Sequence, residues 1–219
     1  YTTKEQLIYV KKVTKDLLLG FEVTEEKKGE CTLENIAEPS HEKYEIILKK
    51  LFFVVKLDAK EILACISSLD NIDMQKRMEN RHAIDTYANF IRRSIISDRV
   101  GGSRDSYLLY FLVSMITLAQ HAYFNISATV DKPKMLSNQT IQVFQKVNEG
   151  IDLLYEAFYK RDLDSYNKLE NLKMETQRKL YNLLPNSKGI NNVVLYHLGE
   201  VIRHLQMAGT VVAGLGTSR

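Results

Sequence analysis

The chain contains an internal repeat, and this feature constrains its fold more than any other. Residues 110–122 read YFLVSMITLAQHA, and residues 196–208 read YHLGEVIRHLQMA. At a constant offset of 86 residues, five residue types recur: Tyr110, Leu112, Ile116, Gln120 and Ala122 return as Tyr196, Leu198, Ile202, Gln206 and Ala208. The apolar positions have helical spacing. The sequence therefore predicts a duplicated helical unit in which each copy carries this helix.

Composition and charge exclude several classes of protein. With 219 residues, 45% of them hydrophobic, the chain can bury a core without disulfides or metals. The 30 basic residues nearly match the 27 acidic ones, which weakly favours an acidic partner and does not indicate nucleic-acid binding. Cys31 and Cys65 are the two cysteines, and Cys65 lies in an apolar stretch. We expect a buried reduced thiol there, not a secreted disulfide scaffold.

Residues 106–130 contain no Asp, Glu, Lys or Arg, so this stretch resembles a membrane span in length. Polar residues interrupt it at helical spacing: Ser114, Thr117, Gln120, His121 and Asn125. A polar stripe on an apolar helix is typical of a helix buried among other helices. We therefore expect a central helix of a cytoplasmic protein, without membrane insertion. No signal peptide is evident, and a start at Tyr1 indicates a segment further upstream.

Periodicity predicts a small N-terminal segment over residues 1–38, followed by six long helices. The segment should hold a helix over 3–17 and a β-hairpin that turns at Lys28 and Gly29, with Phe21 and Val23 facing Cys31 and Leu33. The first three long helices are expected at about 40–67, at 70–98 with Asp70 as N-cap, and at 104–130 with Ser103 as N-cap. The fourth should begin near Pro133, the fifth should be capped by Asp162, and the sixth should span about 189–215.

Short connections make consecutive helices antiparallel neighbours. The predicted fold class is therefore all-α, a tandem pair of three-helix bundles over residues 39–131 and 132–219. A single irregular helical bundle is the alternative.

This arrangement resembles the PhoU family of phosphate-uptake regulators. Residues 119–122, AQHA, are similar to the end of that family's third-helix pattern. Residues 79–91, ENRHAIDTYANFI, are similar to its acidic segment, with Asp85 on the last acidic position. Residues 20–36, GFEVTEEKKGECTLENI, are similar to a segment before the first bundle of archaeal-type members. In that group, an AbrB-like DNA-binding module precedes the segment, and here it would lie upstream of Tyr1.

The resemblance implies a regulator of phosphate uptake and homeostasis that acts through protein contacts. Its implied partner is the ATPase of the phosphate transporter or a sensor component, with a homodimer as a further possibility. DNA would be bound only through the missing upstream module, which would couple the chain to transcriptional regulation. Two alternatives remain open: a module that senses a metal or small ligand, and the dimerisation domain of a transcriptional regulator.

Family members often hold iron or zinc through carboxylates four residues apart, a spacing that places both on one helix face. This chain has lost most of them; the corresponding positions are Arg81 with Asp85, Ile116 with Gln120, Met174 with Arg178, and Arg203 with Met207. We therefore expect no cofactor and no family-type metal cluster. Arg81 and Asp85 should form an ion pair instead. If any metal binds, His82, Asp85 and His121 are the candidates.

No catalytic motif is evident: the sequence has no G-x-S-x-G, no H-E-x-x-H and no glycine-rich phosphate loop. We therefore predict that the protein is not an enzyme. His197 and His204 are expected at the surface or between helices. Gly209 and Gly214 belong to a series of small residues that permits close helix packing, either within the chain or against a partner. Gln120 and Gln206, the repeated glutamines, are the other candidates for packing or partner contacts.

Overall fold

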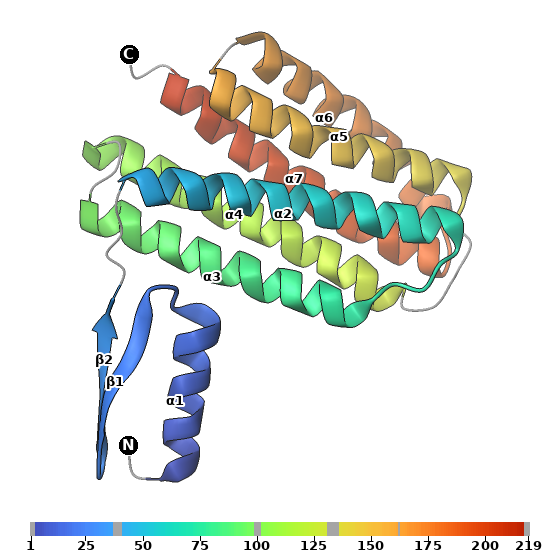
Figure 1. Cartoon of the computed structure of the whole chain (residues 1–219). Helices are drawn as coiled ribbons and strands as arrows, with labels where there is room; N and C mark the ends of the chain where they lie inside the picture. The colour runs from blue at the N-terminus through green and yellow to red at the C-terminus, as the bar shows by residue number, and fades with distance from the viewer. Residues whose placement is uncertain (1–2, 37–40, 99–101, 131–135, 162, 217–219) are drawn as a thin grey trace.

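The computed structural model describes residues 3–36, 41–98, 102–130, 136–161 and 163–216, and these are predominantly helical. This confirms the all-α class with a short helix and hairpin in front (Figure 1). The elements are α1 (Lys4–Leu17), β1 (Phe21–Lys27), β2 (Glu30–Asn35), α2 (His41–Ser68), α3 (Met74–Asp98), α4 (Gly102–Thr129), α5 (Asn138–Lys160), α6 (Leu163–Leu183), a 3-10 turn (Leu184–Asn186) and α7 (Ile190–Gly216).

The hairpin turns at the predicted Lys28 and Gly29, and Gly29 has φ 90°, a conformation that suits glycine. Val23 pairs with Leu33 as expected. A register shift between Val23 and Glu25 changes the remaining pairs, so that Cys31 faces Glu26 and Phe21 faces Asn35. The prediction that Phe21 and Val23 face Cys31 and Leu33 is therefore confirmed for Val23 and Leu33, whereas Phe21 and Cys31 have other direct partners, because the bulge inserts one residue into β1.

Two predicted helix starts need correction. Leu69 adopts φ 60° and ends α2, and α3 begins only at Met74. Asp73, not Asp70, caps α3, since its Oδ1 accepts a hydrogen bond from the backbone N–H of Lys76 at 3.0 Å.

Ser103 lies inside α4 and so does not precede it. The side chain of Ser137 caps α5 by accepting from the backbone N–H of Thr140. Pro133 and Asp162, predicted at the starts of α5 and α6, lie outside the described residues.

The long helices pack as two successive groups of three. α2, α3 and α4 contact one another, as do α5, α6 and α7, and α4 lies along α7 in the most extensive contact between the groups (Figure 1). α2 also contacts α5, where Phe52 packs among the rings of Tyr155, Phe158 and Tyr159. One hydrophobic cluster runs through both groups. The proposed division into domains at residues 131 and 132 stays a prediction.

The repeated positions have closely similar environments on α4 and α7. Leu112, Ile116 and Ala122 are buried on α4, and their counterparts Leu198, Ile202 and Ala208 are buried on α7. Tyr110 and Tyr196 are both exposed. The repeated positions therefore bury the same face of each repeat helix.

Among the described residues, α4 is the one helix long and apolar enough to cross a membrane. More than half of that stretch is buried, mainly against α3 and α7. This is the environment of a core helix in a water-soluble bundle, where apolar length serves packing between helices.

The N-terminal segment stands apart from the bundle and contacts it through α3 (Figure 1). Three side chains on one face of α3 donate to backbone carbonyls at the end of α1 and two residues past it: Thr86 to Asp16 O, Asn89 to Leu17 O, and Arg93 to Leu19 O. Carbonyls at a helix C-terminus have no partner within the helix, so these bonds satisfy groups that would otherwise need water.

Candidate functional site

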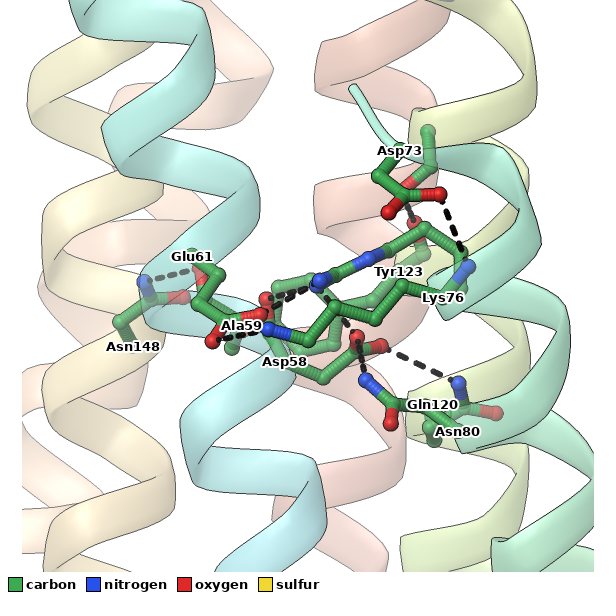
Figure 2. A network of polar contacts seen from close by, with 11 residues as sticks. Asp58, Ala59, Glu61, Asp73, Lys76, Asn80, Gln120, Tyr123 and Asn148 are labelled. Carbon is green, nitrogen blue, oxygen red and sulfur yellow. Dashed lines mark hydrogen bonds and ion pairs between the residues drawn. The ribbon is translucent and has the colours of Figure 1, made fainter.

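A buried carboxylate lies where α2, α3 and α4 meet (Figure 2). Asp58 is fully buried, and its Oδ1 accepts from Arg77 Nη1 at 2.6 Å and from Asn80 Nδ2 at 2.7 Å. Its Oδ2 accepts from Gln120 Nε2 at 3.2 Å. Asp58 therefore joins the first three long helices through charge-assisted bonds in a water-poor environment.

Burial and hydrogen bonding shift the pKa of Asp58 in opposite directions. Removal from water raises the pKa of the Asp58 carboxyl, while the bonds from Asn80, Arg77 and Gln120 lower it, and burial prevails. A second carboxylate lies closer to solvent. Desolvation raises the pKa of Glu61, but the bonds from Lys76 and Arg77 outweigh it, so the pKa of Glu61 falls below its ordinary value.

Glu61 accepts from Lys76 Nζ at 2.7 Å and from Arg77 Nη2, so Arg77 bridges both carboxylates. Glu61, Lys76 and Arg77 also line a depression of about 310 Å³ at the connection between α2 and α3, together with Cys65 and Asp73. In this depression, the positive side chains of Lys76 and Arg77 lie beside the carboxylates of Glu61 and Asp73. The charges compensate one another and leave little excess charge for a ligand.

The network continues into the second group of helices. Tyr123 Oη on α4 donates to Asn148 Oδ1 on α5 at 2.8 Å, and Asn148 Nδ2 donates to the carbonyl of Ala59 on α2 at 3.0 Å (Figure 2). Tyr123 is fully buried, and burial raises its pKa well above the ordinary value, so it acts as a neutral hydrogen-bond donor. These bonds fix the position of α5 against α2 and α4.

Not every buried polar atom of the network has a partner. Gln120 Oε1 and Arg77 Nε are buried, and the described residues offer neither a hydrogen bond. An unsatisfied buried polar group costs about 1–3 kcal/mol. The network is therefore a specific arrangement that the surrounding apolar packing must support.

Sequence reasoning selected Gln120 but missed Asp58 and Arg77. A signal was present, because Asp58 lies three residues after Val55 and four before Ile62, both on the apolar face of α2. Arg77 likewise lies seven residues before the buried Ile84. A charged residue on the core face of a helix needs a partner, and each of these residues is the other's partner.

The two repeated glutamines make different contacts. Gln120 is fully buried against Asp58, whereas Gln206 is half-buried and accepts from Gln177 Nε2 on α6 at 3.4 Å. Both contacts link a repeat helix to a neighbour within its own group. The two positions thus have a packing role in the structure.

The metal candidates come together only in part. His121 Nε2 lies 3.0 Å from Asp85 Oδ1, but His82 is exposed and does not complete a group with them. Across the described ranges, no three or more His, Cys, Asp or Glu side chains gather in a way that could hold a metal. The predicted ion pair between Arg81 and Asp85 is wrong, since Asp85 pairs with His121 and the Arg81 guanidinium lies 4.7 Å from the centre of the Phe124 ring.

Gly209 and Gly214 both allow close approach within the chain. A Cβ on Gly209 would lie 3.2 Å from Leu169 Cδ2 on α6, and one on Gly214 would lie 3.4 Å from Leu108 Cδ1 on α4. His197 Nδ1 lies 2.8 Å from Glu200 Oε2 on the same helix. His204 is partly buried between helices, and desolvation together with the Arg203 charge lowers its pKa.

Comparison of the chain with models of protein families, with curated proteins and with solved structures found no match.

Proposed function

We propose that this protein regulates phosphate uptake through contacts with other proteins, as its resemblance to the PhoU family implies. The observation that carries the proposal is the helix arrangement. Two successive groups of three long helices follow a helix and a hairpin, and the repeat helices α4 and α7 lie against each other. This order and packing are what the family resemblance leads one to expect.

The proposed mechanism is surface recognition in the cytoplasm, with the long helix faces as docking surfaces. The partner would be the ATPase of the phosphate transporter or a sensor component, and the protein itself would catalyse no reaction. Neither a cofactor nor a family-type metal cluster forms part of the proposal. The Arg77–Asp58 network supports this mechanism because it holds α2, α3 and α4 as one rigid unit that a partner can recognise.

A second candidate is the dimerisation domain of a transcriptional regulator. The docking of α1 supports one part of this candidate, the rigid attachment of an upstream module, since three bonds from α3 hold the C-terminal end of α1 in a fixed orientation. A DNA-binding module attached upstream of α1 would then be held rigidly on the bundle.

Affinity capture of the full-length protein from cells grown with high and with low phosphate tests both candidates. Recovery of a phosphate-transporter component or its sensor in either condition supports the first. Recovery of promoter DNA with no transport component contradicts the first and supports the second.

A further inference from the structure

α2 carries two seams of residues at heptad spacing, on opposite faces. The inner seam faces the core and consists of Tyr44, Leu48, Leu51, Val55, Asp58 and Ile62. The outer seam follows the same alternation of four and three residues and consists of Ile46, Lys50, Phe53, Leu57, Lys60 and Ala64. A heptad seam is the pattern by which one helix packs along another.

The outer seam is open to solvent in the described structure. Ile46 is 54% exposed, Phe53 64% and Leu57 41%. In Figure 1, α2 crosses the front of the bundle, and none of the described helices lies over its outer side. Three large apolar side chains in one line span about 16 Å, a length of surface that a second helix could cover.

The charges beside this line are mainly positive. Lys50 and Lys60 lie in the seam itself, and Lys49, Lys56 and Glu45 flank it on one side. Asp152 on α5 binds Lys56 at 2.7 Å and Lys60 at 3.5 Å, so that one carboxylate serves two lysines. Glu61, on the other side, is already engaged by Lys76 and Arg77.

We propose that the outer seam of α2 binds a helical segment of another protein, one with apolar residues at heptad spacing and with Asp or Glu opposite Lys50 and Lys60. Such a helix would cover Phe53 and Leu57 and pair both lysines. The inference rests on the proposed function in one respect, since it names the surface through which a regulatory partner would be held.

The pattern disfavours a second copy of this chain. In an antiparallel pairing of two α2 helices about a twofold axis at residue 55, Phe53 meets Leu57, but Lys50 meets Lys60 at both ends. In a parallel pairing, each lysine meets its own copy. Like charges placed directly opposite oppose association, whereas carboxylates at those positions favour it.

A lipid surface is also disfavoured. A bilayer interface takes apolar side chains over a broad helix face, whereas the three large exposed apolar side chains of the outer seam lie in one line that also holds Lys50 and Lys60. A facing helix needs only such a line, because each seam residue enters a gap between residues of its neighbour.

The test uses the full chain and two synthetic helices of about three heptads with leucine seams. One has glutamate opposite Lys50 and Lys60, and the other has lysine there. The variants are Phe53→Ser, Lys50→Glu and, as matched control, Ile96→Ser, which changes an equally exposed apolar side chain on α3 (68% exposed). Circular dichroism confirms that each variant is folded, and fluorescence anisotropy measures binding.

We expect the acidic helix to bind at least about tenfold more tightly than the basic one. Phe53→Ser should weaken binding of the acidic helix at least about tenfold, Lys50→Glu should reduce its preference over the basic helix, and Ile96→Ser should change nothing. Equal binding of both helices, or equal weakening by Ile96→Ser, overturns the proposal.

A photo-reactive residue at position 53 identifies the natural occupant in cells. Cross-linking to an acidic amphipathic helix of a different protein supports the proposal, while cross-linking to lipid or to α2 of a second copy overturns it. If these tests fail but a transporter component is still captured by the full-length protein, the regulatory function stands and uses another surface.

Discussion

Arg77 Nη1 lies 2.6 Å from Asp58 Oδ1, and the two side chains are only 5% and 0% exposed. This buried ion pair joins α2 to α3, and Gln120 extends it to α4. Each charge compensates the other, because both side chains are almost fully withdrawn from water. Removal of one partner should therefore cost more than removal of both.

Arg77→Met leaves the Asp58 carboxylate buried without its cation and should destabilise the protein by about 3–5 kcal/mol. The double variant Asp58→Leu with Arg77→Met should lose less than Arg77→Met alone, because no buried charge remains uncompensated. Urea unfolding measures both free energies. A single variant within about 1 kcal/mol of wild type would show that the pair does not hold these helices together.

Asp58 should also determine part of the pH dependence of stability. Burial raises the native pKa of Asp58 above its ordinary value of 3.8. As the pH rises from 3.8 to the native pKa, the unfolded chain ionises first, so this carboxyl contributes progressively less to stability. Its stabilising contribution is complete below 3.8 and is lost once the pH passes the native pKa.

The side chain in the Asp58→Asn variant does not titrate, so the stability of this variant does not fall through ionisation at position 58 as the pH rises. The unfolding free energy of Asp58→Asn minus that of wild type should therefore increase as the pH rises through that window. Urea unfolding at a series of pH values measures the difference. A difference that decreases with pH would mean that Arg77, rather than burial, controls the native pKa of Asp58.

Arg93 should hold the N-terminal segment on the bundle. It donates to Leu19 O, and its guanidinium lies 4.6 Å from the centre of the Phe21 ring. Arg93→Ala should raise amide hydrogen exchange in α1 and the hairpin without changing exchange in α5–α7, because the described part of the segment is held on the bundle through α3. Lys12→Ala, on the exposed side of α1, is the control. Unchanged exchange in α1 after Arg93→Ala would contradict this role.

Metal removal should leave the protein unchanged. His121 and Asp85 form a pair, and no third ligand joins them in the described part of the chain. Dialysis against a chelator should therefore not shift the thermal midpoint, and metal analysis should find less than one ion per chain. A stabilising shift on zinc addition that His121→Ala abolishes would refute this prediction.

The sequence predicted the helices well because long apolar periodicity dominates local structure. The face of α2 with Tyr44, Leu48, Leu51, Val55 and Ile62 is buried as expected. The start of α3 was misplaced because Asp70 and Asp73 are both acceptable caps by composition. The left-handed backbone of Leu69 and the burial of Ile72 place the start of α3 after Asp73 and not after Asp70. Both features depend on tertiary packing.

The candidate site was harder to predict than the fold. The repeat identified Gln120 but not Asp58, the residue that it contacts. Periodicity assigns residues to faces and does not say which faces meet, so the contact between Asp58 and Arg77 required the structure. The same limit explains why His82 was wrongly grouped with Asp85 and His121 as a metal candidate. It shares α3 with Asp85 but does not join the pair that Asp85 forms with His121.

The proposed role in phosphate uptake is tested most directly by the rate of labelled phosphate uptake in cells that lack this protein. In phosphate-rich medium, uptake should exceed that of wild-type cells and return to the wild-type rate when the full-length protein is restored. If uptake is the same with and without the protein, at high and at low phosphate, the protein does not regulate phosphate uptake.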